Sequence, residues 1–445
     1  MNTLCFFQRL ILTGVFGLLS CASARAADAP KRLNILFILT DDQRFDTVHA
    51  MGNAIIQTPN MDKLVARGFS FTNVFSQGGM VPAMCLPSRT MIMTGRSIFH
   101  IPGANPKNFT DPTIAGVFND AGYSSIYIGK KGNSFIPGNE AFSKFFYLQH
   151  GSEAPGQDEN SLQAQHPKVM ADQAIEFLRA QKEKPFFVFL APHYPHDPRV
   201  APKRFHEMYD PAKMPLPENF LPEHPFDNGA LNVRDENLAP HPRTPDVMKQ
   251  HLVDYYTCIS YLDEQIGRVI DTLKEIGHAD DTIIVFTSDQ GLSVGGMHGL
   301  MGKQNLYEEF KSPLTIVGPG IAHGKSGALV YLFDLFPTLC DLTGVAKPKV
   351  CEGASLVPVM KGEGSRVREL LFAPYIETQR MVRDERWKLI WYPKVARFQL
   401  FDLASDPWEQ RDLNDKPEQS AKLAEMKKKL AAEQDRWDDT ATRPQ

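Results

Sequence analysis

The segment from Cys85 to Arg96 combines a thiol, a guanidinium group and a proline in the pattern of a helix start. Pro87 is favourable in the first turn of a helix, where its missing N–H is no loss. Cys85 would then lie beside free backbone N–H groups and the positive end of the helix dipole. Arg89 adds a permanent cation with a planar fork of donors. The segment therefore predicts an anion-binding site, and a buried structural cysteine before a helix is the common alternative.

Asp41 and Asp42 are adjacent carboxylates that follow the apolar run 33–40. An uninterrupted apolar run of this length is typical of a strand buried on both faces of a parallel sheet. Open α/β sheets bind their ligands beyond the carboxyl ends of such strands. Two carboxylates this close repel each other unless a cation lies between them, and a hard cation prefers oxygen ligands. The pair therefore predicts a cation site, with a solvated turn and helix cap as the alternative.

Other strand-like runs also end in residues that can do chemistry. The runs are 124–128, 185–190 and 282–288, each short and apolar as buried strands are. The residues that follow them are Lys130, then His193 and His196, and then Asp289 and Gln290. Histidines in a proline-stiffened loop suit proton transfer near neutral pH. For His196, a substrate contact and a structural role are the two alternatives. We expect these side chains to meet Asp41 and Asp42 at one edge of the sheet.

Two further segments are candidates for the border of the same site. Lys303 follows a glycine-rich stretch that includes His298, and glycines permit close approach of the backbone to a ligand. His298 is near enough to Lys303 in the sequence to line the same pocket. The segment 198–245 is long, polar and proline-rich, and a loop of that length is usually functional or disordered. We expect it to form part of a substrate rim, or else a surface excursion packed by its own prolines.

The order of strand-like and helical patterns predicts an α/β fold. Buried apolar strands alternate with helical stretches such as 247–276, so we expect a large mixed, mostly parallel sheet sandwiched by helices. Near the C-terminus, strand patterns lie at 380–383, 387–392 and 398–402, and a charged amphipathic helix at 420–436. The sequence therefore predicts a catalytic domain over 27–355. It also predicts a smaller C-terminal α+β subdomain, an antiparallel sheet plus a helix, over 356–445.

Composition and hydropathy exclude some classes of function. The chain has 445 residues and a formal net charge of −4, so no basic field indicates a nucleic-acid partner. Beyond the N-terminus, no apolar run is long enough to span a membrane. Arg9, the apolar run 10–19 and the small residues at 24–26 predict a signal peptide over 1–26. We therefore expect export to the periplasm or the medium, with a lipid anchor on Cys21 as the alternative.

Cys258, Cys340 and Cys351 remain besides Cys85 once the predicted signal peptide is removed. In an oxidising compartment, Cys340 and Cys351 are close enough in the sequence to pair, which leaves Cys258 buried in a helix. Free thiols at all of these positions are the alternative, and the spacing does not decide between the two.

The run Cys85-Leu86-Pro87-Ser88-Arg89, followed by Thr94-Gly95-Arg96, resembles the signature of the type I sulfatases of the alkaline phosphatase superfamily. The resemblance implies that a maturase oxidises Cys85 to formylglycine (3-oxoalanine), whose hydrated aldehyde attacks the sulfur of a sulfate monoester. It also implies one bound Ca²⁺. The implied calcium ligands are Asp41, Asp42, Asp289, Gln290 and the converted Cys85. The implied sulfate-binding residues are Lys130, Lys303 and Arg89, and His193 is the implied proton donor to the leaving alcohol.

Two positions depart from the family pattern. Gly132 stands where a histidine usually follows Lys130, and Asn133 cannot transfer a proton. We therefore expect either that His298 or another group assists sulfate release or that this step is slow. Gln290 stands where the family has Asn or His, and its amide oxygen can still bind calcium. The resemblance implies hydrolysis of sulfate monoesters, on a sulfated carbohydrate or a small sulfate ester. A phosphate or phosphonate monoester hydrolase and an inactive sulfate-glycan-binding homologue are the alternatives.

Overall fold

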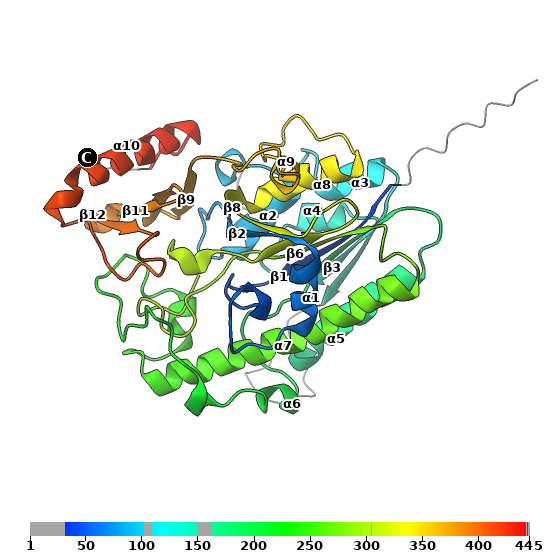
Figure 1. Ribbon diagram of the computed structural model, residues 1–445, viewed down its shortest axis with the longest axis horizontal. Coiled ribbons are helices and arrows are strands. Elements are labelled where there is room, and N and C mark those ends of the chain that lie inside the picture. Colours follow the sequence, from blue (N-terminus) through cyan, green and yellow to red (C-terminus); the bar gives the residue numbers. More distant parts are fainter. Residues whose placement is uncertain (1–31, 102–108, 149–161, 304, 442, 444–445) are drawn as a thin grey trace, which may run out of the picture. The chain divides into compact units, whose positions relative to one another are not determined.

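A large sheet forms the centre of the protein, with helices on both of its faces (Figure 1). The order of its eight strands is β4-β3-β5-β1-β6-β7-β2-β8. Their bounds are β1 (Asn34–Thr40), β2 (Phe69–Phe75), β3 (Ser124–Lys130), β4 (Lys144–Leu148), β5 (Phe186–Ala191), β6 (Thr282–Ser288), β7 (Leu314–Val317) and β8 (Gly324–Tyr331). β7 runs antiparallel to β6 and β2, and the other neighbouring strands are parallel. The predicted large, mostly parallel sheet is confirmed.

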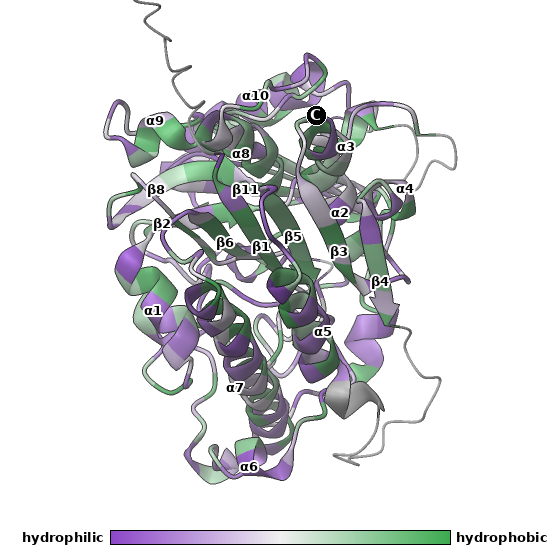
Figure 2. Ribbon diagram, turned by 90° about the vertical axis from the view of Figure 1, so that its right-hand side faces the viewer, coloured by the Kyte–Doolittle hydropathy of each residue, from purple (hydrophilic) through white to green (hydrophobic). Residues whose placement is uncertain are grey.

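The apolar runs of the sequence become the central strands because both faces of the sheet are covered. Every residue of β1, β5 and β6 is buried, and these strands are hydrophobic along their length in Figure 2. Successive side chains of a strand point to opposite faces. Ile35 and Phe37 accordingly join one hydrophobic core, whereas Leu36 and Ile38 join the other.

Helices cover the two faces in separate layers (Figure 1). The helices on the Leu36 face are α1 (Pro59–Arg67), α5 (Leu162–Arg179), α6 (Lys203–His206) and α7 (Pro245–Glu275). Those on the Ile35 face are α2 (Cys85–Thr94), α3 (Ile114–Asp120), α4 (Ile136–Glu140), α8 (Leu335–Thr343) and α9 (Val357–Met360). The long helix predicted over 247–276 is α7. Its apolar stripe, including Leu252 and Ile259, packs on the sheet as expected.

A second, smaller sheet forms the C-terminal part. Its four antiparallel strands lie in the order β12-β11-β10-β9. Their bounds are β9 (Leu371–Tyr375), β10 (Gln379–Arg383), β11 (Trp387–Tyr392) and β12 (Arg397–Asp402), and helix α10 (Ser420–Arg436) packs against β9, β10 and β11. The predicted antiparallel sheet and helix are therefore confirmed. This sheet shares a hydrophobic core with Phe75 and Met84 of the large part, and the domain boundary near residue 356 stays a prediction.

The structure is a computed structural model, and it describes residues 32–101, 109–148, 162–303, 305–441 and 443. The predicted signal peptide over 1–26 and Cys21 lie outside these residues. Within the described part, no helix has the length and hydrophobicity needed to cross a bilayer. Cys85, Cys258, Cys340 and Cys351 are free and buried, so the structure shows the alternative of unpaired thiols at Cys340 and Cys351.

Candidate functional site

The site begins where β1 and β6 end side by side. Thr40 and Ser288, their last residues, are paired in register, so the acidic residues that follow them meet. The Asp42 N–H donates to Asp289 Oδ1 at 3.0 Å, and the Asp289 N–H donates to the Thr40 carbonyl at 3.1 Å. Asp42 has a φ of 66°, in the left-handed region that only a few non-glycine residues adopt. Sheet register therefore fixes the carboxylates, as the sequence predicted.

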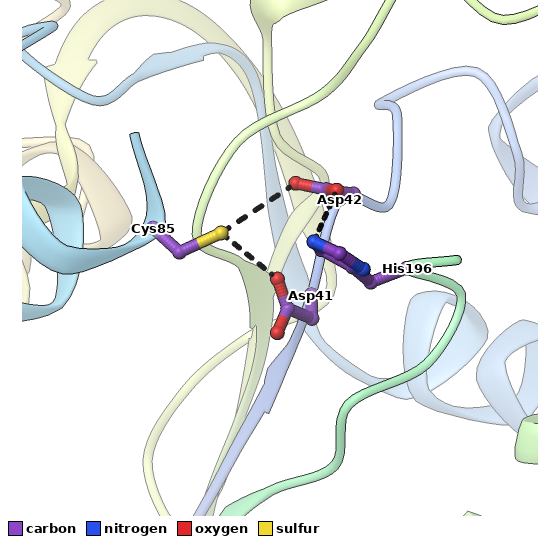
Figure 3. A group of neighbouring side chains, drawn as sticks. All are labelled: Asp41, Asp42, Cys85 and His196. Carbon is purple, nitrogen blue, oxygen red and sulfur yellow. Dashed lines mark hydrogen bonds and ion pairs between the residues drawn. The ribbon is translucent and has the colours of Figure 1, made fainter. Parts of the chain in front are cut away.

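Helix α2 delivers Cys85 to these carboxylates. Cys85 is the first residue of the helix, and every residue of α2 except Leu86 is buried. Its Sγ lies 3.1 Å from Asp41 Oδ1 and 3.8 Å from Asp42 Oδ1 (Figure 3). Burial and the adjacent Asp41 carboxylate raise the pKa of the Cys85 thiol well above its usual value. The unmodified side chain is therefore a thiol at neutral pH and a poor nucleophile.

Arg89, one turn further along α2, contacts carboxylates that follow both β1 and β6. Its Nε donates to Asp289 Oδ2 at 3.0 Å, and its guanidinium also lies 3.3 Å from Asp41 Oδ2. Ser88 Oγ donates to the Asp289 carbonyl at 2.6 Å. These contacts lock the helix start onto the sheet edge, so the thiol position is set by the rigid scaffold.

Two buried lysines each pair with one of the adjacent carboxylates. Lys130, the last residue of β3, forms an ion pair with Asp41. Lys303 Nζ lies 2.8 Å from Asp42 Oδ2 and 3.4 Å from Cys85 Sγ. Burial would lower the pKa of Lys303, but Asp42 and the other acidic neighbours raise it well above its usual value. Both ammonium groups therefore stay charged and lie beside the position that Cys85 occupies.

His193 and His196 lie on the loop that follows β5. Pro195 of this loop forms a parallel β-bridge with Asp41. Both rings donate to the Asp197 carbonyl, at 3.2 Å from His193 Nε2 and 2.7 Å from His196 Nδ1. Burial lowers the pKa of His193 well below its usual value and that of His196 to about 3. His196, whose role the sequence left open, thus lies in the site with its Nε2 3.7 Å from Asp42 Oδ2.

A metal ion fits this arrangement. Single ligand atoms of Asp41, Asp42, Cys85 and His196 all lie within 4.8 Å of one another, and all four residues are buried (Figure 3). Gln290 Oε1 is buried without a hydrogen-bond partner among the described residues, because the amide donates through Nε2 to Asp42. Turning this amide about its last bond would present an oxygen ligand instead. The described residues therefore include a group able to hold a metal ion.

Asp289 is placed differently from the other predicted ligands. Its Oδ1 accepts the Asp42 and Gln290 backbone N–H groups, and its Oδ2 accepts Arg89. Burial, with the like charge of Asp41, raises the pKa of Asp289 to about 6. The structure brings Asp289 into the site, and its role as a metal ligand stays a prediction.

A pocket of about 440 Å³ opens above these groups. It is lined by Pro82, Ala83, Lys130, Gly132, Asn133, His193, His196, Asp197, Pro198, Val233, Arg234, Asp235 and Lys303. A Cβ atom built on Gly132 would meet nothing within 4 Å, so the position where a histidine was expected is open space. Pro198 and the residues 233–235 belong to the segment 198–245, so part of that segment lines the pocket, as expected for a substrate rim.

The prediction that His298 lines this pocket is wrong. Its ring stacks on Tyr307 with centroids 3.9 Å apart, and its Nε2 lies 3.0 Å from Asn219 Nδ2 and 3.7 Å from Glu309 Oε2. None of these residues lines the pocket. His298 has a φ of 51° between glycines of positive φ, so the chain turns sharply between it and Lys303. Proximity in sequence did not place the two side chains together.

Sequence reasoning did not single out three charged residues of the pocket wall, although two of them belong to the segment 198–245 that it placed at the rim. Arg234 forms ion pairs with Asp197 and Asp235, and it thereby joins the histidine loop to the segment before α7. Asp197 directly follows the histidine loop, and that position was a usable signal. Arg234 and Asp235 lie in an irregular segment without periodicity, so only the folded chain identifies them.

Comparison with known proteins identifies the family of this chain. A sequence model described as Sulfatase matches residues 33–345, and one described as N-sulphoglucosamine sulphohydrolase, C-terminal, matches residues 296–436. An N-acetylglucosamine-6-O-sulfatase of Bacteroides thetaiotaomicron is 27% identical over 97% of this chain and 91% of its own length.

Solved structures share the fold. One, a complex with D-glucosamine-2-N,6-O-disulfate, has a TM-score of 0.76 at 24% identity and covers 92% of this chain and 99% of its own. A phosphonate monoester hydrolase from Silicibacter pomeroyi also has a TM-score of 0.76 at 24% identity, over 91% of this chain and 96% of its own. The family model covers well over half of the sequence, and its strand ends carry the site described above. The chain belongs to the sulfatase family of the alkaline phosphatase superfamily.

Proposed function

We propose that this protein hydrolyses sulfate monoesters of a sulfated carbohydrate. The observation that carries the proposal is the set of three buried cations, Lys130, Lys303 and Arg89, around the buried Cys85 at the start of α2. A helix start and fixed cations bind a tetrahedral anion and stabilise the charge that develops on it during transfer. Similarity to an N-acetylglucosamine-6-O-sulfatase favours a sugar as the alcohol part.

Cys85 is the position of the nucleophile in this proposal. Its thiol is buried and its pKa is raised, so the unmodified residue is unsuited to attack. Converted to formylglycine by a maturase, residue 85 would supply a hydroxyl nucleophile in the same place. Arg89 and Lys303 lie beside that place and hold the side chain.

Ca²⁺ is the proposed metal. Asp41, Asp42, Asp289, Gln290 and the converted residue 85 would hold it, and the oxygen-rich set suits a hard cation. The ion would polarise the sulfate group and favour the ionised form of the nucleophile. The buried, unpartnered Gln290 Oε1 supports this assignment.

The other residues bind the sulfate group and move a proton. Lys130 pairs with Asp41 and Lys303 with Asp42, and both would neutralise the charge of the transferring group. His193 lines the pocket with its Nε2 3.2 Å from the Asp197 carbonyl, and in its protonated form it would donate a proton to the leaving alcohol and return to the neutral ring. His196 lies beside it, with ring centroids 4.4 Å apart.

A phosphonate or phosphate monoester hydrolase is the second candidate, because such an enzyme would use nearly identical residues and a phosphonate monoester hydrolase shares the fold. The open space at Gly132 favours the third candidate, an inactive sulfate-glycan-binding homologue. The test is a panel of matched aryl sulfates, phosphates and phosphonates, together with defined sulfated saccharides. The protein is made with a maturase. We expect sulfate release with a preference for sulfated sugars. Faster phosphonate cleavage would reverse the assignment, and binding of sulfated sugars without turnover would indicate an inactive homologue.

Export is part of the proposal. A signal peptide over 1–26 would bring the enzyme to the periplasm or the medium. Fractionation of cells that express the full sequence, followed by N-terminal sequencing of the mature protein, tests it. Retention of the uncleaved chain in the cytoplasm would contradict export, and palmitate labelling lost in Cys21→Ala would show the lipid anchor instead.

A further inference from the structure

A second pocket of about 480 Å³ lies where the C-terminal sheet meets the segment that precedes Cys85. Its lining residues are Met80, Glu377, Arg380, Pro393, Lys394, Asp439, Thr440 and Ala441. They come from four places: the segment before α2, the turn and start of β10, the connection from β11 to β12, and the chain after α10. None of them lines the active-site pocket.

The segment before Cys85 connects the two pockets. Gly79 is fixed to the C-terminal sheet, because its N–H donates to the Pro374 carbonyl at 3.0 Å and its carbonyl accepts the Ile376 N–H at 2.7 Å. Met80, the next residue, lines the second pocket, whereas Pro82 lines the active-site pocket. Two residues span at most about 7 Å, so the two walls are neighbours.

The segment before α7 makes a second connection. A Cβ atom on Gly229 would lie 3.4 Å from Lys394 Cδ and from Thr378 Cγ2, so this segment packs directly against the wall of the second pocket. Val233 and Asp235, only a few residues later, line the active-site pocket. Four residues span at most about 14 Å. Two separate segments thus place the pockets within the reach of one short oligosaccharide.

Lys394 is the group in the second pocket that is free to bind an anion. It is exposed, and among the described residues no carboxylate forms an ion pair with it. Arg380, by contrast, is fully used: it is buried, pairs with Asp439 and donates to the carbonyls of Ile376 and Gln379. Glu377 and Thr440 add exposed polar groups that suit sugar hydroxyls.

We propose that the second pocket is a subsite for a neighbouring sugar of a chain substrate, with Lys394 receiving a sulfate or carboxylate substituent of that sugar. The inference rests on the proposed function, because the first sugar lies in the active-site pocket. The substrate class is then an oligosaccharide or polysaccharide that carries more than one anionic group, and a monosaccharide sulfate fills only the first pocket.

The test compares D-glucosamine-2-N,6-O-disulfate with a sulfated tetrasaccharide that carries the same scissile group. In the wild type, we expect a lower KM for the tetrasaccharide. In Lys394→Glu, its KM rises about three- to tenfold, the range for loss and reversal of an exposed charge contact. The kcat for both substrates and the KM for the monosaccharide stay unchanged. Lys394→Arg keeps the low KM, and Lys416→Glu, at an exposed lysine that lines neither pocket, has no effect.

A binding experiment separates this inference from the proposed function. Calorimetry measures tetrasaccharide affinity in full-length Cys85→Ala protein with and without Lys394→Glu. Weaker binding in the double variant supports the subsite even if no sulfate ester is hydrolysed. The subsite would be overturned if Lys394→Glu changed the affinities for the monosaccharide and the tetrasaccharide equally, or if it left tetrasaccharide affinity unchanged. The sulfatase assignment would stand in either case. Desulfated and uronate-free tetrasaccharides show which substituent Lys394 contacts.

Discussion

Two clusters of buried charge both include residues of the segment 289–311, and they have different surroundings. In the active site, Lys130, Lys303 and Arg89 surround the adjacent Asp41 and Asp42 under an open pocket. The second cluster, here called the interface cluster, consists of Glu308, Lys311, Arg383, Lys388 and Glu409. It joins the large sheet to the C-terminal sheet.

The clusters differ in whether their charged groups reach the active-site pocket. In the interface cluster, Glu308 lies 2.8 Å from both Lys311 and Arg383, and Lys388 bridges Glu308 and Glu409. Burial would raise the pKa of Glu308, but these cations hold it well below its usual value. Each cluster also holds a carboxylate whose pKa burial raises, Asp42 in the active site and Glu409, to about 8, in the interface cluster. Lys130 and Lys303 line the active-site pocket, whereas no member of the interface cluster lines it. Buried charges that reach a pocket indicate function, and buried charges enclosed between two parts of the fold indicate an interface.

Loss of the nucleophile should produce the largest effect. Cys85→Ala is expected to lower kcat about 10⁶-fold, the order found when a covalent nucleophile is removed. The thermal midpoint should hardly change, because the alanine leaves the helix start intact. Mass spectrometry of the peptide that contains residue 85 should show formylglycine in active wild-type protein. Cys258→Ala, at a buried thiol of α7, is the control and should remain active. Unmodified cysteine in fully active enzyme would contradict this assignment.

Metal removal should come next. Extensive chelation, or Asp42→Asn, is expected to lower kcat about 10⁴-fold, because the ion stabilises several kcal/mol of developing charge. Elemental analysis should find about one calcium per chain in the wild type and none in Asp42→Asn. Asp280→Asn, at an exposed carboxylate, should keep both metal and activity. Full activity in metal-free protein would remove calcium from the proposal.

Loss of the proton donor should have a graded effect. His193→Ala is expected to reduce kcat about 10²–10⁴-fold, the usual contribution of general acid–base catalysis. The loss should be greatest for sulfate esters of weakly acidic alcohols, which need the proton most. Rates over a series of alcohols measure this dependence. His278→Ala, at a histidine that pairs with Asp281 outside the pocket, serves as control. Equal losses across the series would assign His193 a binding role instead.

The interface cluster should affect stability more than chemistry. Glu308→Gln leaves buried cations without a partner and is expected to cost about 3–5 kcal/mol of unfolding free energy, with kcat nearly unchanged. A lowered pKa means that Glu308 stabilises the fold above its ordinary pKa of 4.5, and that this contribution is lost as the pH falls below it. Denaturant titrations should therefore show the gap between wild type and variant shrinking in acid. A large loss of kcat at full stability would break the distinction between the clusters.

His298 should give the smallest effect. His298→Ala removes the stacking on Tyr307 and is expected to cost about 1–3 kcal/mol of stability. Its kcat should stay within about twofold of the wild type, because the side chain lies outside the pocket. Paired measurements of thermal unfolding and turnover decide this. A selective loss of turnover would return His298 to the catalytic groups.

Much of the site was predictable because strand ends are local signals. Apolar runs fixed β1, β5 and β6, and the residues directly after them had to meet at one sheet edge. The edge strands β4 and β8 and the strand β9 carry weaker patterns, and only their pairing with neighbouring strands identifies them.

The sequence by itself determined which chemistry is available: the Cys85 segment, the paired carboxylates and the lysines are set by residue type and by distance from a strand or helix end. Tertiary structure alone decided where His298 points, that Cys340 and Cys351 stay unpaired, and that Arg234 and Lys394 border neighbouring pockets. The physical reason is that side-chain direction after a glycine turn, and contacts between segments far apart in the chain, depend on packing. The local periodicity of the sequence does not encode that packing.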